Sequence, residues 1–357
     1  MITRKQVDIN SVLNVRSTKS VLYFLNEEDS LAFMSTCKKL YENQKLWQLM
    51  VFRPLNSAEM QQVSHPTDTN FRKLFQRRRN EILYKTEQWL SRHSNLRQSF
   101  FPILCNWLVE LHFELFTKEN RRLLCKDPLG PIHLAVKYLY RYMSITQNVS
   151  RSRLQLVGVS CYQVAVSCLL SDNEMRKLEL DSKRFAYYTD NAYSPEEVTS
   201  MTANILKTLD FKVCVFTPKK ATEEILSKLG KSCSRLTALF AHYFIDLTMH
   251  STMFACHLPS TVAAAAILVA SKETGNPIRP GSKQYQTLVN YSLQPQDIPK
   301  CVKVVKKIYE EAKKQETGGT FDIDSLPRHS MVIKHYQVEF IESVKGSLIP
   351  SLSKKLF

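Results

Sequence analysis

The sequence predicts an all-α protein in which a small helical module is followed by a tandem repeat of one helical bundle. The chain of 357 residues has only 8 glycines and 14 prolines, so few positions interrupt helices. Its apolar residues mostly recur three and four positions apart, as on one face of a helix. Two segments of small and apolar residues, VSCYQVAVSC (159–168) and AAAAILVASK (263–272), occupy the same place in two successive sets of helices. Side chains this small suit the central helix of a bundle, which predicts the repeat.

The N-terminal part predicts a small module and a connector. Within residues 10–50, two short apolar patterns flank the acidic turn NEEDS (26–30) and predict a helical hairpin. Residues 51–98 predict a connector, which is interrupted at Pro54 and Pro66 and contains the basic segment FRKLFQRRRNEILYK (71–85), also expected to be helical.

The first bundle is predicted at residues 99–215. Its helices are expected in ILCNWLVELHFELF (103–116), IHLAVKYLYRYM (132–143), RLQLVGVSCYQVAVSCLL (153–170) and VTSMTANILKTL (198–209). Ser194 is expected to cap the last of these helices, with Pro195 at its first position and Glu197 completing a capping box.

The second bundle is predicted at residues 216–316, before a tail at 317–357. Thr217 and Pro218 are expected to open its first helix, and Gly230 to close it. Further helices are expected in SRLTALFAHYFIDLTM (234–249), LPSTVAAAAILVASKE (258–273) and KVVKKIYEEAKK (303–314).

Composition and motifs argue against several classes of protein. The net charge of +16 is spread along the chain, and no zinc finger, RNA-recognition signature or basic zipper accompanies it, so we do not expect nucleic-acid recognition. The sequence has no GxGxxG, GxxxxGK[ST], GxSxG or HExxH, so we expect no catalysis and no cofactor. Nine cysteines without a CxxC pair predict neither a metal site nor disulfides. Without a membrane-spanning run or a secretory signal, we expect a protein of the nucleus and cytoplasm.

Residues 20–47, SVLYFLNEEDSLAFMSTCKKLYENQKLW, resemble an F-box, the helical module that docks on the Skp-type adaptor of cullin-RING ubiquitin ligases. The family usually opens with Leu-Pro, whereas this chain has Leu13 followed by Asn14. The resemblance implies that the adaptor contacts apolar residues of this module, namely Leu13, Val21, Leu22, Leu25, Leu31 and Trp47. The alternative is a helical cap on the following domain.

Six further motifs resemble, in the family's order, those of the cyclin box and its C-terminal repeat. They are NWLVEL (106–111), LAVKYLYRYMS (134–144), RLQLVG (153–158), YYTDNAY (187–193), ILKTLDF (205–211) and PSTVAAAAILVAS (259–271). The resemblance spans about residues 99–315 and implies two tandem five-helix cyclin folds.

Two functions follow from these resemblances, and the sequence leaves both open. The first is a non-catalytic substrate-recognition subunit of an SCF-type ubiquitin ligase, with a Skp-type adaptor and a cullin as partners. The alternative is a cyclin that activates a cyclin-dependent protein kinase. Kinase-activating cyclins bind the kinase through a Lys and a Glu, and at these two positions this chain has Ser167 and Thr202. Such cyclins also carry an Asp-Arg pair, of which this chain keeps Arg141 but has Tyr140 in place of the Asp. The lost charges favour the first function.

The helix that begins at Phe100 resembles the cyclin helix whose surface groove binds Arg/Lys-x-Leu segments of protein substrates. The resemblance implies a groove formed by Phe100, Ile103, Leu104 and Trp107, with Glu110 at its rim to attract the basic residue. Leu108 and Leu111 are expected in the core, and Phe101 stands where the family has Arg. The alternative is that the whole apolar stripe is buried.

Overall fold

The computed structural model describes residues 90–116, 129–213, 215–251, 256–316 and 330–336, which all belong to one compact unit, 83–357. Every regular element in these ranges is helical, and the prediction of an all-α chain with two tandem folds is confirmed. The F-box-like module at 10–50, with its six predicted adaptor-binding residues, lies outside the described residues, as do most of the connector and the tail.

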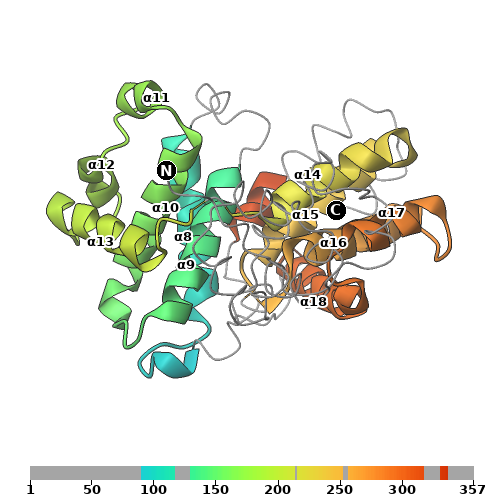
Figure 1. Ribbon diagram of the computed structural model, residues 1–357, viewed down its shortest axis with the longest axis horizontal. Coiled ribbons are helices and arrows are strands. Elements are labelled where there is room, and N and C mark those ends of the chain that lie inside the picture. The colour runs from blue at the N-terminus through green and yellow to red at the C-terminus, as the bar shows by residue number, and fades with distance from the viewer. Residues whose placement is uncertain (1–89, 117–128, 214, 252–255, 317–329, 337–357) are drawn as a thin grey trace, which may run out of the picture. The chain divides into compact units, whose positions relative to one another are not determined.

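The first fold is a bundle around α10 (Figure 1, left). The small side chains of this helix let four other helices of the fold pack on it. Residues 159–166 of this central helix are all buried except Gln163. The helices of this fold are α8 (Phe100–Leu115), α9 (Gly130–Ile145), α10 (Leu154–Leu169), α12 (Ser182–Tyr187) and α13 (Pro195–Thr208), with the short α11 (Asp172–Lys177) between α10 and α12.

The second fold is a bundle around α16, in which the alanine run 263–266 is completely buried (Figure 1, right). Both segments of small residues thus form central helices, as predicted. The helices of this fold are α14 (Pro218–Leu229), α15 (Arg235–Thr248), α16 (Pro259–Glu273), α17 (Lys283–Tyr291) and α18 (Ile298–Glu316).

Two helix starts follow the predicted local chemistry. At α13 the Ser194 hydroxyl accepts from the Glu197 N–H at 3.3 Å, and the Glu197 carboxylate accepts from the Ser194 N–H at 2.9 Å, which completes the capping box. At α14 the Thr217 side chain accepts from the Lys220 N–H at 3.2 Å. Gly230 ends α14 at φ 52°, a conformation that favours glycine.

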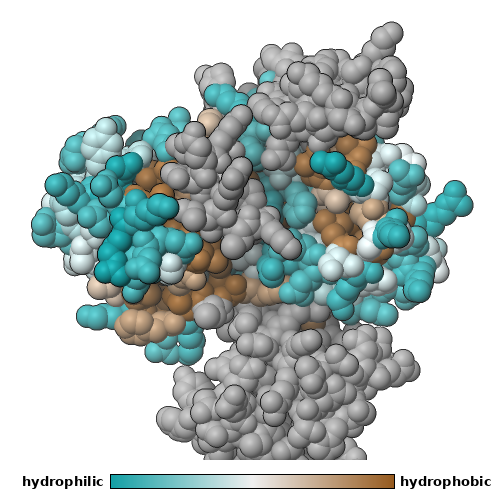
Figure 2. All heavy atoms as spheres, turned by 90° about the horizontal axis from the view of Figure 1, so that it is seen from above, coloured by the Kyte–Doolittle hydropathy of each residue, from teal (hydrophilic) through white to brown (hydrophobic). Residues whose placement is uncertain are grey.

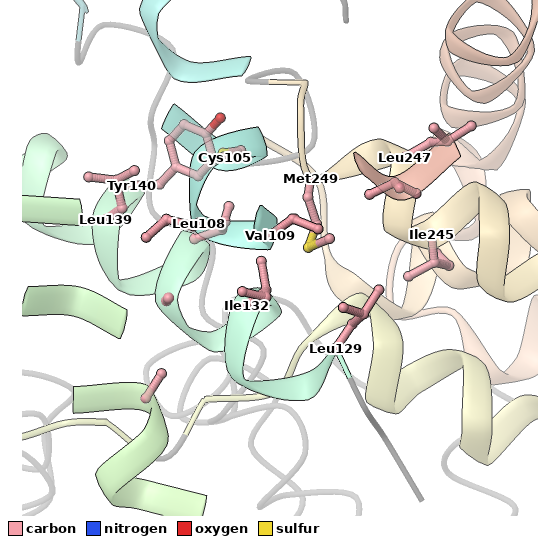
Figure 3. Packing of buried hydrophobic residues seen from close by; sticks show 14 of the residues in the cluster. Cys105, Leu108, Val109, Leu129, Ile132, Leu139, Tyr140, Ile245, Leu247 and Met249 are labelled. Carbon is pink, nitrogen blue, oxygen red and sulfur yellow. The ribbon is translucent and has the colours of Figure 1, made fainter. Parts of the chain in front are cut away.

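The two folds share one continuous cluster of buried apolar residues. Figure 3 shows Met249, at the end of α15, lying next to Val109 of α8, with Leu129 and Ile132 from the start of α9 close by. All four side chains are buried. Since the second fold contributes to the same core as α8, the helix that was predicted to form a docking groove is supported from behind by both folds.

A buried polar cluster, which we call the joint, connects the folds. The Asp246 carboxylate on α15 accepts from His133 of α9 at 2.7 Å, from Lys219 of α14 at 2.8 and 3.0 Å, and from the Tyr336 hydroxyl at 2.5 Å. Burial raises the pKa of Asp246, but the Lys219 cation and the His133 hydrogen bond more than offset it, so this pKa lies below its ordinary value. Asp246 is therefore a buried carboxylate that stays ionised and has donors on every side.

Residues 330–336, the C-terminal strap, return to the first fold. The Met331 N–H donates to the Asn106 side-chain oxygen of α8 at 2.7 Å, and the ring of His335 lies 4.9 Å from the ring of Phe113. Val332, Ile333 and the Tyr336 side chain are buried. The strap thus contacts α8 and, through Tyr336, the joint.

Candidate protein-docking site

Helix α8 has two faces of opposite character. Phe101, Cys105 and Leu108 have no exposed surface, and burial raises the pKa of the Cys105 thiol to about 12, so this cysteine is an inert core residue. On the other side of the helix, Ile103 is 56% exposed, Trp107 is half-buried and Glu110 is exposed. These residues lie three or four positions apart and therefore share one face.

A groove of about 510 Å³ lies along this exposed face, and we call it the acidic groove. It contains three carboxylates and three aromatic rings, one of which, Tyr187, is 64% exposed. Its lining residues are Trp107, Glu110, Leu111 and Glu114 from α8, and Tyr187, Tyr188, Asp190 and Asn191 from the end of α12 and the turn after it.

The turn after α12 places the third carboxylate in the acidic groove. Asp190 and Asn191 have φ of 54° and 56°, a left-handed conformation that these two residue types tolerate well. The Asp190 N–H donates to the Tyr187 carbonyl at 3.0 Å, and the Asn191 N–H donates to the Ala186 carbonyl at 3.3 Å. Carboxylates beside exposed rings attract a cation twice, by charge and by the ring faces, so the groove suits a basic, partly apolar segment.

The predicted groove residues take different places in the structure. Trp107 and Glu110 line the acidic groove, and Ile103 is exposed one turn before Trp107 on the same face. Phe100 is half-buried, with the Arg151 guanidinium 4.8 Å above its ring. Leu104 is buried where α8 meets Gly158 of α10. The apolar stripe is therefore divided between core and surface.

Five lining residues were not predicted from the sequence, namely Glu114, Tyr187, Tyr188, Asp190 and Asn191. Glu114 lies one turn after Glu110, so helical spacing alone could have placed it on the same face. Tyr187 and Asp190 belong to the motif YYTDNAY, but their nearness to Trp107 arises only in the folded chain, where the end of α12 and the turn after it line the same groove as α8. No local pattern in the sequence signals that nearness.

Ser167 and Thr202, the positions where the resemblance implies a kinase-binding Lys and Glu, carry uncharged side chains. Ser167 is exposed near the end of α10. The Thr202 hydroxyl of α13 donates to the Gln163 side-chain oxygen at 3.0 Å, and Gln163 in turn donates to the Ser182 hydroxyl at 3.1 Å. An uncharged hydrogen-bond network thus joins α10, α12 and α13 at this position.

Tyr140 belongs to the core and not to a contact surface. It is buried, and its ring stacks on the buried ring of Phe101 with centroids 5.9 Å apart. Phe101 and Tyr140, which the resemblance places where the family has Arg and Asp, therefore form an aromatic pair within the core.

Large hydrophobic side chains are exposed at several positions of the first fold. Figure 2 shows a mostly hydrophilic outer margin, with hydrophobic residues visible on both the left and the right of that view. Of the described residues, the exposed large hydrophobic ones all belong to the first fold, namely Ile103, Ile145, Leu169, Tyr187 and Phe211. Phe211 is 66% exposed and has φ of 52°, an uncommon and strained conformation for an aromatic residue.

Neither a metal site nor a membrane span is found in the described ranges. There, no group of three or more His, Cys, Asp and Glu side chains is arranged to hold an ion. None of the helices in these ranges is both long and apolar enough to cross a membrane.

The sequence of this chain is similar to those of cyclins. The chain matches the family profiles described as "Cyclin, N-terminal domain" at residues 71–214 and "Cyclin, C-terminal domain" at residues 216–323. It is 31% identical over 258 residues to the G2/mitotic-specific cyclin-B of Marthasterias glacialis, which covers 71% of this chain and 58% of that protein. It is 29% identical over 175 residues to the G1/S-specific cyclin-D1 of Homo sapiens, which covers 48% of this chain and 53% of that protein. The chain thus spans little more than half the length of these relatives.

One solved structure, of a viral cyclin from Herpesvirus saimiri, aligns with a TM-score of 0.52. The alignment covers 65% of this chain and 94% of the viral chain at 17% identity, which shows a likeness of fold.

Proposed function

Because the chain belongs to the cyclin family, we propose that it is a non-catalytic regulatory subunit that binds a cyclin-dependent protein kinase and recruits protein substrates in cell-cycle control. The acidic groove is the observation on which substrate recruitment rests. It gathers three carboxylates and three aromatic side chains, Trp107, Tyr187 and Tyr188, in a chain of net charge +16. A local field opposite in sign to that of the whole protein selects basic segments.

The groove suits a basic-x-Leu segment for geometric reasons. A Lys or Arg side chain is attracted by Glu110, Glu114 and Asp190, while Trp107 and the exposed Ile103 offer apolar contact for a leucine on the same helix face. Trp107 is half-buried and therefore held in place, as an anchor for binding should be.

A fluorescence-anisotropy titration tests this assignment with a labelled peptide that contains one Arg-x-Leu-Phe segment. Trp107→Ala should abolish binding, and Glu110→Gln with Asp190→Asn should weaken it at least tenfold and reduce its salt dependence. Glu310→Gln is a matched control, since this exposed carboxylate lies on α18, outside the groove. Equal affinity for the wild type and the groove variants would refute the assignment.

For the kinase, exposed apolar residues can compensate for the missing charges. Losing one charge-assisted contact costs about 1.5–3 kcal/mol. Leu169 lies two residues after Ser167 and is 49% exposed, and Phe211 follows α13. Fully burying an exposed Leu or Phe side chain gains about 1.5–3 kcal/mol, and because Leu169 and Phe211 are already partly buried, each would gain about half to two thirds of that. These gains offset part of the two losses, so we expect an interface that is more apolar and less salt-sensitive than a charged one.

Affinity purification of the full chain tests the kinase assignment. Leu169→Ser with Phe211→Ser should greatly reduce kinase recovery, whereas Ile145→Ser, which changes another exposed apolar residue of the same fold, should not. The assignment fails if the double variant recovers as much kinase as the wild type.

A second candidate function, substrate receptor of an SCF-type ubiquitin ligase, is favoured by the neutral network at Thr202. Uncharged side chains at both former kinase-binding positions suit a cyclin that works without a kinase. In this case the F-box-like residues 20–47 would bind a Skp-type adaptor and its cullin. Recovery of adaptor and cullin without kinase, lost on Leu25→Ala with Leu31→Ala, supports this function. Recovery of kinase without adaptor refutes it.

A further inference from the structure

The C-terminal strap lies beside the acidic groove. Its contacts on α8 are Asn106 and Phe113, the immediate sequence neighbours of the groove residues Trp107 and Glu114. Successive residues on a helix are 100° apart, and the whole helix is about 10–12 Å wide with its side chains. The chain that continues after Tyr336 therefore starts one helix flank away from the groove.

The chain after the strap contains a segment that complements the groove. Lys354 and Lys355 are followed by Leu356 and Phe357, and 17 residues separate Lys354 from Tyr336. A chain of that length spans up to about 60 Å, several times the width of α8. Two adjacent cations suit the three carboxylates, and the following apolar pair suits Trp107 and the exposed Ile103.

We propose that residues 354–357 occupy the acidic groove of the same chain and compete there with basic-x-Leu segments of substrates. The proposal rests on the proposed function, in which this groove binds such segments. The competition is intramolecular because the tail belongs to the same chain, and the strap holds the start of the tail between α8, through His335, and the joint, through Tyr336. With an effective concentration of about 1 mM and a Kd of about 100 µM for the free segment, substrates would bind about tenfold more weakly than to an open groove.

The test uses a labelled peptide of residues 351–357, Ser-Leu-Ser-Lys-Lys-Leu-Phe, titrated against the full chain. Two tail variants open the groove by different means. Lys354→Glu with Lys355→Glu reverses the charge, and Leu356→Ser with Phe357→Ser removes the apolar pair. Both should bind the peptide about tenfold more tightly than the wild type. The matched control Lys345→Glu changes a charge in the same tail outside the segment and should bind like the wild type.

Hydrogen exchange supplies a readout that needs no added peptide. Amides of residues 351–357 should exchange more slowly in the wild type than in the Glu110→Gln, Asp190→Asn double variant. This variant replaces exposed side chains with near-isosteric ones and so preserves the fold. Equal exchange in both proteins, or equal peptide affinity for the wild type and the tail variants, would overturn the proposal.

The remaining outcomes separate this proposal from the proposed function. If the Arg-x-Leu-Phe peptide binds the groove but the 351–357 peptide does not, only the tail proposal fails. If neither peptide binds any variant, both fail. If the wild type dimerises and Lys354→Glu with Lys355→Glu abolishes the dimer, the tail docks in a second copy, which overturns docking within one chain.

Discussion

Replacing Asp246 by Asn tests the joint between the folds. The substitution keeps the shape of the side chain but removes the charge that faces Lys219, whose ammonium is also buried. It also places an NH₂ group where a carboxylate oxygen accepts from His133, Lys219 or Tyr336, so at least one donor then faces another donor. Breaking one side of a buried ion pair costs about 3–5 kcal/mol.

Thermal unfolding measures this cost. For a domain of this size, 1 kcal/mol shifts the Tm by about 2–4 °C, so Asp246→Asn should lower the Tm by about 6–20 °C. Asp210→Asn is the matched control, because Asp210 pairs with Lys212 on the surface and its loss should leave the Tm unchanged. Lys219→Met added to Asp246→Asn should recover part of the loss, since it removes the buried ammonium that has lost its counter-ion. A Tm within 2 °C of the wild type for Asp246→Asn would refute the joint.

The joint also predicts a loss of stability in acid. Asp246 has a lower pKa in the folded chain than its ordinary value of about 3.9, so the unfolded chain binds more protons as the pH falls below about 4. The stabilisation from Asp246 is present above that pH and decreases below it. In Asp246→Asn, this part of the acid dependence of the free energy of unfolding should be absent.

Four other substitutions test the core and its protonation. Phe101→Arg alone and Tyr140→Asp alone each bury an unpaired charge and should cost about 3–5 kcal/mol, while the double variant should recover much of this in a double-mutant cycle by urea denaturation. Gly158→Ala would place a Cβ 2.9 Å from a Leu104 methyl, so we expect a loss of about 1–2 kcal/mol in the same assay, and no loss would show that the Leu104 side chain can move aside. Burial lowers the pKa of His250 to about 4, so stability should fall by about 3 kcal/mol as the pH decreases from about 6.5 to about 4, and His250→Gln should flatten this slope.

Local patterns predicted the helices and their ends because the responsible interactions are local. The capping box at Ser194 and the glycine stop at Gly230 involve residues no more than four positions apart. The two small-residue helices were placed at the bundle centres because side-chain size alone decides which helix can be packed on all sides.

Contacts between distant segments were not predictable in the same way. Asp190 joins the acidic groove only because the turn after α12 lies next to α8 in the folded chain, and Asp246 meets His133 across 113 positions of sequence. The stacking of Tyr140 on Phe101 was not predicted either, because a sequence does not show which side chains from different helices meet in the core.

The joint, the strap and the acidic groove form one connected path. Tyr336 donates to Asp246 in the joint, while His335, its neighbour, lies against Phe113 on the flank of α8. The position from which the tail departs is therefore fixed by a carboxylate that has its full set of donors only while the two folds are docked, since His133 comes from the first fold and Lys219 from the second. A change that opens the joint would release Tyr336 and lengthen the tether of residues 354–357. Because effective concentration falls as a tether lengthens, docking of the folds and occupancy of the groove by the tail should decrease together.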